Sequence, residues 1–187
     1  MVVETTEENG FNLTPQRLRQ AITPKTKALI LNSPSNPTGM IYSRQHLEDL
    51  AQVCLEADLY VIADEMYSKL IFDGKEFVSF PTLSEAVKAH TILVNGASKT
   101  YAMTGWRIGF AAASREIIQV MNNYLSHSLS GTCSIAQAAA AEAFGGPQKE
   151  IEAMRQAFET RRNYLYDRMS QIPGVHPVPV GGRPSIC

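Results

Sequence analysis

The chain alternates between short apolar stretches and longer segments in which apolar residues recur every three or four positions. The short stretches predict strands, and the periodic segments predict amphipathic helices. Strands are expected at 28–31, 59–63, 91–94 and 108–113, and helices at 15–22, after Ser43, and at 116–124, 136–144 and 148–171. The stretch 59–63 is almost continuously apolar, which is typical of a parallel strand covered on both faces. Together the elements favour an α/β fold built around a layered sheet.

Capping residues mark where several of these helices begin and end. Thr14 precedes Pro15, an arrangement that suits a helix start because proline needs no amide partner there. Ser43 is placed to cap the helix whose apolar face uses residues 47–55, and Pro173-Gly174 is expected to stop the last helix.

Polar residues follow three of the expected strands at the points where those strands end. Asn36 lies in the turn-rich segment 32–39, Asp64 and Tyr67 come directly after 59–63, and Lys99 follows 91–94. In open α/β sheets, ligands bind in the crevice outside the carboxyl ends of the strands. We therefore expect these side chains, distant in sequence, to meet at one edge of the sheet.

Lys99 and Arg107 indicate what that edge binds. A lysine in apolar surroundings loses its proton more readily, and the neutral amine can attack an aldehyde to form a Schiff base. Arg107, eight positions later, offers a planar fork for a phosphate. An aldehyde that carries a phosphate is pyridoxal phosphate, which the pair therefore suggests as the cofactor.

The other strand-end residues match what pyridoxal chemistry requires of a protein. Asp64 is the candidate anion for the pyridine nitrogen, which a nearby carboxylate keeps protonated. Asn36 and Tyr67 can each donate a hydrogen bond to the phenolic oxygen. Lys99 is the candidate catalytic residue, because its amine, once freed, can carry a proton to and from the substrate carbon.

Composition narrows the function classes without choosing among enzymes. The 187 residues suit one domain or most of one, and 44% are hydrophobic, enough for a core. With 17 basic and 18 acidic residues, the charge balance gives no case for nucleic acid or an anionic membrane as partner. The chain shows no membrane-spanning run and no signal-peptide pattern. Three well-separated cysteines, Cys54, Cys133 and Cys187, form no metal-binding motif and fit a reduced, cytoplasmic setting.

Three motifs resemble those of the class I aminotransferases in the fold type I pyridoxal-phosphate superfamily. They are Asn36-Pro37-Thr38-Gly39, Asp64-Glu65-Met66-Tyr67, and the segment from Ser98-Lys99 to Trp106-Arg107-Ile108-Gly109. Their order and spacing are those of the family, and the last resembles the bacterial aspartate aminotransferase branch. Gly96 stands where many relatives carry a phosphate-binding serine, so Ser98 is a weaker phosphate candidate than Arg107.

The resemblance implies a fold, a reaction and an assembly. The fold is a three-layer sandwich with a mostly parallel sheet, the large domain of such enzymes in incomplete form. The reaction is amino-group transfer between an amino acid, with aspartate the leading candidate, and a 2-oxo acid. The resemblance also implies a homodimer with shared active sites and a cis peptide bond at Asn36-Pro37.

Relatives in this family are considerably longer, which sets an expectation for the domains. Residues 1–171 are expected to form part of the cofactor-binding large domain, and 172–187 the start of a connection to a small domain, with an atypical tail. The glycine-rich phosphate loop, the ring-stacking aromatic and the substrate-carboxylate arginine would lie outside this chain. We therefore expect the chain alone to be poorly stable and to have little transaminase activity, since unpaired strand edges invite aggregation.

Other interpretations of the same residues stay open at this point. The chain could be a non-catalytic cofactor-binding remnant, the effector domain of a regulator, or part of a β-lyase of the same fold. Asp64 could instead cap a helix beginning at Glu65, Tyr67 could be a core aromatic, and Asn36 an ordinary turn residue. Arg161-Arg162 is expected to be a solvated helix face.

Overall fold

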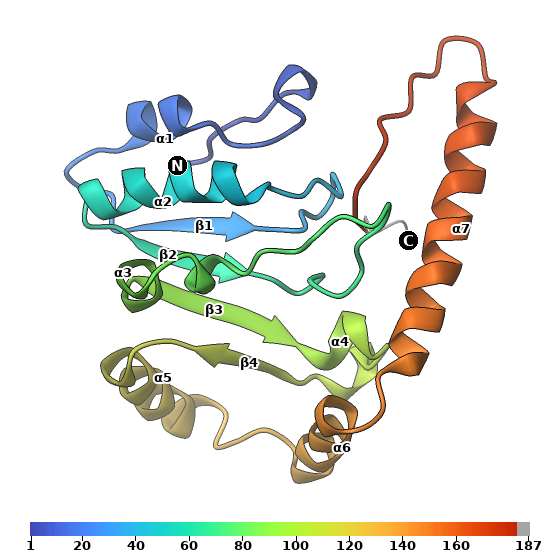
Figure 1. The fold of residues 1–187 in the computed structure, drawn as a ribbon. Coiled ribbons are helices and arrows are strands. Elements are labelled where there is room, and N and C mark those ends of the chain that lie inside the picture. Colours follow the sequence, from blue (N-terminus) through green and yellow to red (C-terminus); the bar gives the residue numbers. More distant parts are fainter. Residues whose placement is uncertain (183–187) are drawn as a thin grey trace.

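A computed structural model of the chain, which describes residues 1–182, contains one four-stranded sheet in the order β1-β2-β3-β4 (Figure 1). The strands are β1 (Ala28–Asn32), β2 (Tyr60–Asp64), β3 (Thr91–Gly96) and β4 (Gly109–Ala112). β1, β2 and β3 run parallel, and β4 pairs antiparallel with β3. The predicted α/β class with a mostly parallel sheet is confirmed.

The helices lie close to where the sequence places them. They are α1 (Pro15–Ala21), α2 (Arg44–Glu56), α3 (Glu85–Ala89), α4 (Ala97–Thr100), α5 (Arg115–Ser128), α6 (Ser134–Gly145) and α7 (Lys149–Ser170). The Thr14 and Ser43 side chains accept the amides of Arg17 and His46, each at 3.3 Å, so both predicted caps are confirmed. The short helices α3 and α4 were not predicted, because segments of five and four residues carry too little periodicity.

One face of the sheet carries the main core. Leu31, Val61 and Ala63 point to this face and pack with α2 residues such as Leu50, which is fully buried. Burying a leucine side chain contributes about 1.5–3 kcal/mol. On the opposite face Ile30 is 73% exposed and Tyr60 is 43% exposed. The expectation that the β2 stretch is covered on both faces is therefore wrong for the described residues.

Charged contacts attach α7 to the rest of the molecule. None of its 22 residues is buried, and Figure 1 shows it standing beyond the ends of β1, β2 and β3. Arg155 donates to the Ile71 carbonyl at 3.1 Å, and Arg162 donates to the Val180 carbonyl at 2.7 Å. Arg161 is exposed as expected, but the expectation is wrong for Arg162, whose side chain is only 10% exposed. Its guanidinium faces the Asp73 carboxylate rather than solvent.

The segment after α7 returns to the sheet domain. Gly182 forms an antiparallel bridge with Ile71 and donates its amide to the Gly39 carbonyl at 2.9 Å. The Phe72 amide donates to the Gly181 carbonyl at 2.8 Å. These bonds hold 181–182 beside the loops that follow β1 and β2. The tail 183–187, including Cys187, lies outside the described residues.

Candidate cofactor site at the carboxyl ends of the strands

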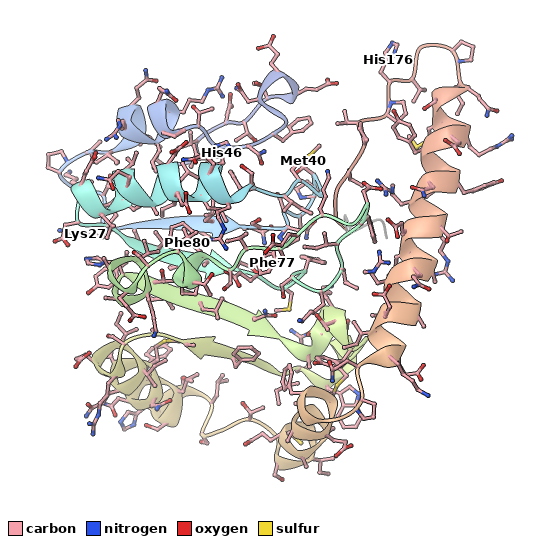
Figure 2. All side chains as sticks on the ribbon, viewed as in Figure 1. Lys27, Met40, His46, Phe77, Phe80 and His176 are labelled. Carbon is pink, nitrogen blue, oxygen red and sulfur yellow. The ribbon has the colours of Figure 1, made fainter. Side chains whose placement is uncertain are left out.

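The three parallel strands end at one edge of the sheet and in register. Asn32 pairs with Asp64, and Asp64 with Val94, so the last residues of β1 and β2 are neighbours. Figure 2 shows Lys27 and Met40 at opposite ends of β1, with Met40 on the side where the site lies. The predicted convergence of the strand-end segments is confirmed by this topology.

A single side chain, Asn32, joins the first two candidate segments. Its Nδ2 donates to the Asp64 carbonyl at 3.1 Å, and its Oδ1 accepts the Asn36 amide at 2.7 Å. The expected cis bond at Asn36-Pro37 is confirmed, and Ser33-Pro34 is also cis. Asn36 itself is exposed at this edge.

The Asp64 turn leads from the β2 end to Tyr67 and Lys99. The Asp64 Oδ1 accepts the Met66 amide at 3.1 Å, and residues 66–69 form a turn, so no helix begins at Glu65. Tyr67 is 5% exposed. The Lys99 Nζ lies 5.9 Å from the centroid of the Tyr67 ring, within the range of a cation–π contact. Lys99 is thus half-buried, on the single turn of α4, against an aromatic face.

Arg107 is held by the segment that carries Lys99. Its Nη1 donates to the Thr104 carbonyl at 3.0 Å, and the Thr104 hydroxyl donates to the Ser98 carbonyl at 3.1 Å. Arg107 has φ 51° and Ala102 φ 53°, left-handed conformations that cost a non-glycine residue roughly 1–2 kcal/mol each. The exposed Arg107 lines an open hollow of about 720 Å³, together with Trp106 and Cys133. A guanidinium in such a hollow is accessible to an anion.

Gly96 lets β4 approach β3 closely at this point. A Cβ on Gly96 would lie 2.9 Å from the Gly109 Cα and 3.0 Å from the Ile108 carbonyl oxygen. A side chain there would force the two strand ends apart. The backbone geometry thus explains why this chain has glycine, and no serine, at position 96.

A buried carboxyl lies directly behind the candidate site. Glu65 is 4% exposed and accepts the Ser79 hydroxyl at 2.7 Å and the Phe80 amide at 2.8 Å. Burial raises the pKa of this carboxyl above its ordinary 4.5, and the Asp64 charge acts in the same direction. Glu65 therefore fixes the loop at 79–80 against the end of β2.

Glu65→Gln tests this arrangement through pH. Glutamine keeps an acceptor for the Phe80 amide, and the Ser79 hydroxyl can turn to accept from the new NH₂. Because the pKa of Glu65 is raised in the folded state, its contribution to the free energy of unfolding is full below about pH 4.5. That contribution is lost as pH rises through the folded-state pKa. The variant should therefore gain stability relative to wild type between pH 4 and pH 8, measured by urea unfolding. A difference that stays constant over that range would contradict the raised pKa.

The structure thus connects the candidate residues. Asn36, Asp64, Tyr67 and Lys99 are linked by contacts and turns, and Arg107 is linked to the Lys99 segment through Thr104 and Ser98. Sequence reasoning missed Asn32, Thr104 and Glu65 as organising residues. The only signal in the sequence was their position beside residues already singled out.

Within residues 1–182, no group of three or more histidine, cysteine, aspartate or glutamate side chains is arranged to hold a metal ion. No helix in that stretch combines the length and the apolar character needed to span a bilayer. Cys54 is buried, which raises the pKa of its thiol to about 11 and keeps it protonated.

Comparisons with known proteins agree with one another. Residues 1–182 match the family model described as aminotransferase class I and II. The chain is 53% identical over 172 residues to an aspartate aminotransferase of Geobacillus stearothermophilus, covering 92% of this chain and 44% of that protein. It is 44% identical over 176 residues to an asparagine–oxo-acid transaminase of Streptococcus mutans, and the match covers 94% of this chain and 45% of that protein. The aspartate aminotransferase structure from Rhizobium meliloti superposes with a TM-score of 0.93 at 38% sequence identity. The superposition covers 95% of this chain and 45% of that protein. The chain therefore spans less than half the length of these relatives.

Proposed function

Because the chain belongs to the class I and II aminotransferase family, we propose that it binds pyridoxal phosphate at the carboxyl ends of β1, β2 and β3. Within the whole protein this site would transfer an amino group between an amino acid and a 2-oxo acid. The observation that carries the proposal is the half-buried Lys99 amine, which lies against Tyr67 beside the strand that ends at Asp64.

The donor set fits the parts of this cofactor. Lys99 supplies the amine that would hold its aldehyde carbon, and Asp64 the carboxylate for its pyridine nitrogen. Asn36 and Tyr67 supply hydrogen-bond donors for its phenolic oxygen. Arg107 supplies a guanidinium for its phosphate, and the Ser98 hydroxyl is a weaker second donor. The left-handed backbone at Arg107 and its bond to Thr104 hold that guanidinium beside the hollow.

When bound, the cofactor supplies an electron sink for the charge left at the substrate carbon. The chain's own residues would bind and orient the cofactor and move protons. The Asp64 carboxylate, fixed by the Met66 amide, would hold positive charge at the ring nitrogen. The Lys99 Nζ, on the single turn of α4, would be the base that takes and returns the proton. The centroid of the Tyr67 ring lies 5.9 Å from that amine.

Aspartate is the proposed amino donor because the relatives of this chain include aspartate aminotransferases from two Bacillus strains and Geobacillus. A homodimer, which the family resemblance implies, and a cytoplasmic setting, which the separated cysteines favour, are part of the proposal. The β-lyase alternative predicts that ammonia is released together with pyruvate. Transamination predicts one 2-oxo acid and one new amino acid, with no ammonia released.

Reduction and peptide mapping test the proposal. The purified chain is incubated with pyridoxal phosphate, treated with borohydride and digested, and the labelled lysine is identified by mass spectrometry. We expect a visible absorbance band that borohydride removes, with the label on Lys99. Label spread over exposed lysines such as Lys69 and Lys149 would overturn the proposed site.

A further inference from the structure

Asn32 occupies a position that none of the candidate roles above explains. It is the last residue of β1, half-buried, and both ends of its carboxamide are bonded. The amide nitrogen reaches the neighbouring strand, and the amide oxygen reaches four residues along its own chain. One short side chain thus connects two loops that carry proposed cofactor contacts.

On the β2 side, Asn32 completes the bonding of the Asp64 carbonyl. That oxygen accepts the Ser33 amide at 3.1 Å, the bond that continues the sheet, and also the Asn32 Nδ2 at 3.1 Å. A carbonyl oxygen has two lone pairs, so both are used. The Asp64 carboxylate is fixed on its other side by the Met66 amide. The Asp64 carbonyl is therefore held from β1, and the Asp64 carboxylate by its own turn.

On the β1 side, Asn32 sets where the loop turns back. The 2.7 Å bond from the Asn36 amide to the Asn32 Oδ1 closes residues 32–36 into a tight turn. The cis bond at Asn36-Pro37 follows directly. An aspartate here would keep this acceptor but lose the donor toward Asp64, so the carboxamide is the group that satisfies both contacts.

We propose that Asn32 is a positioning residue that couples Asp64 to Asn36, and so fixes the group facing the cofactor's ring nitrogen relative to the group facing its phenolic oxygen. The inference rests on the proposed function. Asn32 acts through these two residues and touches no reacting atom.

The test uses the full chain with bound pyridoxal phosphate and compares Asn32→Leu, Asn32→Ala and Asn32→Ser. These variants remove the bridge without adding charge. The readout is the pH midpoint of the visible absorbance change of the bound cofactor. We expect the midpoint to move by about half a pH unit or more, the scale set by losing one hydrogen bond, and in the same direction as in Asn36→Ala.

Val53→Ala is the matched control. Val53 is 1% exposed in α2, so this substitution lowers the melting temperature without touching the bridge. It should leave the pH midpoint unchanged. Unchanged midpoints in the folded Asn32 variants, with a normal band in wild type, would overturn the positioning role alone. A wild-type chain without the band would overturn the proposed function, and the inference with it.

Discussion

Replacing Lys99 with alanine is expected to abolish the visible cofactor band and the borohydride-dependent label. Lys99 is the amine that lies half-buried against the Tyr67 ring, and alanine has no nucleophile to take its place. In the whole protein, turnover should fall by at least ~100-fold, because proton transfer by a positioned base contributes 10²–10⁴-fold. The measurement is the absorbance spectrum with pyridoxal phosphate, followed by single-turnover kinetics with aspartate.

Two variants separate the role of the amine from that of positive charge. Lys99→Arg keeps the charge beside Tyr67 but should also lose the band, because a guanidinium stays protonated and does not attack aldehydes. Lys69→Ala removes an exposed lysine two residues from Tyr67 and should leave the band intact. A normal band in Lys99→Ala, or its loss in Lys69→Ala, would place the cofactor on another lysine.

The sequence predicted the parallel strands and the convergence of their ends for a physical reason. Short hydrophobic stretches such as 59–63 predict strands, and parallel strands bring their carboxyl ends to one edge wherever they lie in the sequence. The helix caps at Thr14 and Ser43 could also be predicted from the sequence, because a helix cap depends on local chemistry. The family motifs then pointed to Asn36, Asp64, Tyr67, Lys99 and Arg107, whose roles stay a proposal.

What the sequence did not predict depends on contacts between distant segments. Asn32 was grouped with the turn, and nothing local showed that its amide reaches across to Asp64. The bond from Thr104 to Ser98 spans a turn whose left-handed residue is Ala102, and an alanine gives no sequence signal for that conformation. The exposure of Ile30 could not be read from its own apolar stretch, because periodicity reports which residues are apolar and not whether a second layer covers them.

The buried contact of Arg162 is another long-range contact that the sequence did not predict. Replacing Arg162 with alanine is expected to lower the free energy of unfolding by about 2 kcal/mol. The substitution removes two bonds to Asp73, the bond to the Val180 carbonyl, and stacking over the Phe72 ring at 5.1 Å. Breaking a buried ion pair costs about 3–5 kcal/mol, but Asp73 is 45% exposed and solvent screens part of the interaction. The melting temperature should fall by roughly 4–8 °C for a domain of this size.

Acid should weaken the same contact. The Arg162 hydrogen bond lowers the pKa of Asp73 below its ordinary 3.8. A carboxyl whose pKa is lower in the folded than in the unfolded state stabilises the fold above its unfolded-state pKa. That stabilisation is lost as pH falls through the folded-state pKa. The stability difference between wild type and Arg162→Ala should therefore shrink from pH 6 to below pH 4, as followed by urea unfolding.

Arg161→Ala is the matched control, one residue away on the same helix. Arg161 is exposed and lies 5.8 Å from the Phe158 ring centroid, so its loss should cost at most about 1 kcal/mol. Because α7 buries none of its residues, polar contacts hold it beside the strand ends: those of Arg155 and Arg162, and the bond from the Asp73 amide to Glu159. Equal destabilisation by the two alanine variants would mean that α7 is held by its general packing, and that the Arg162–Asp73 contact has no special part in placing it.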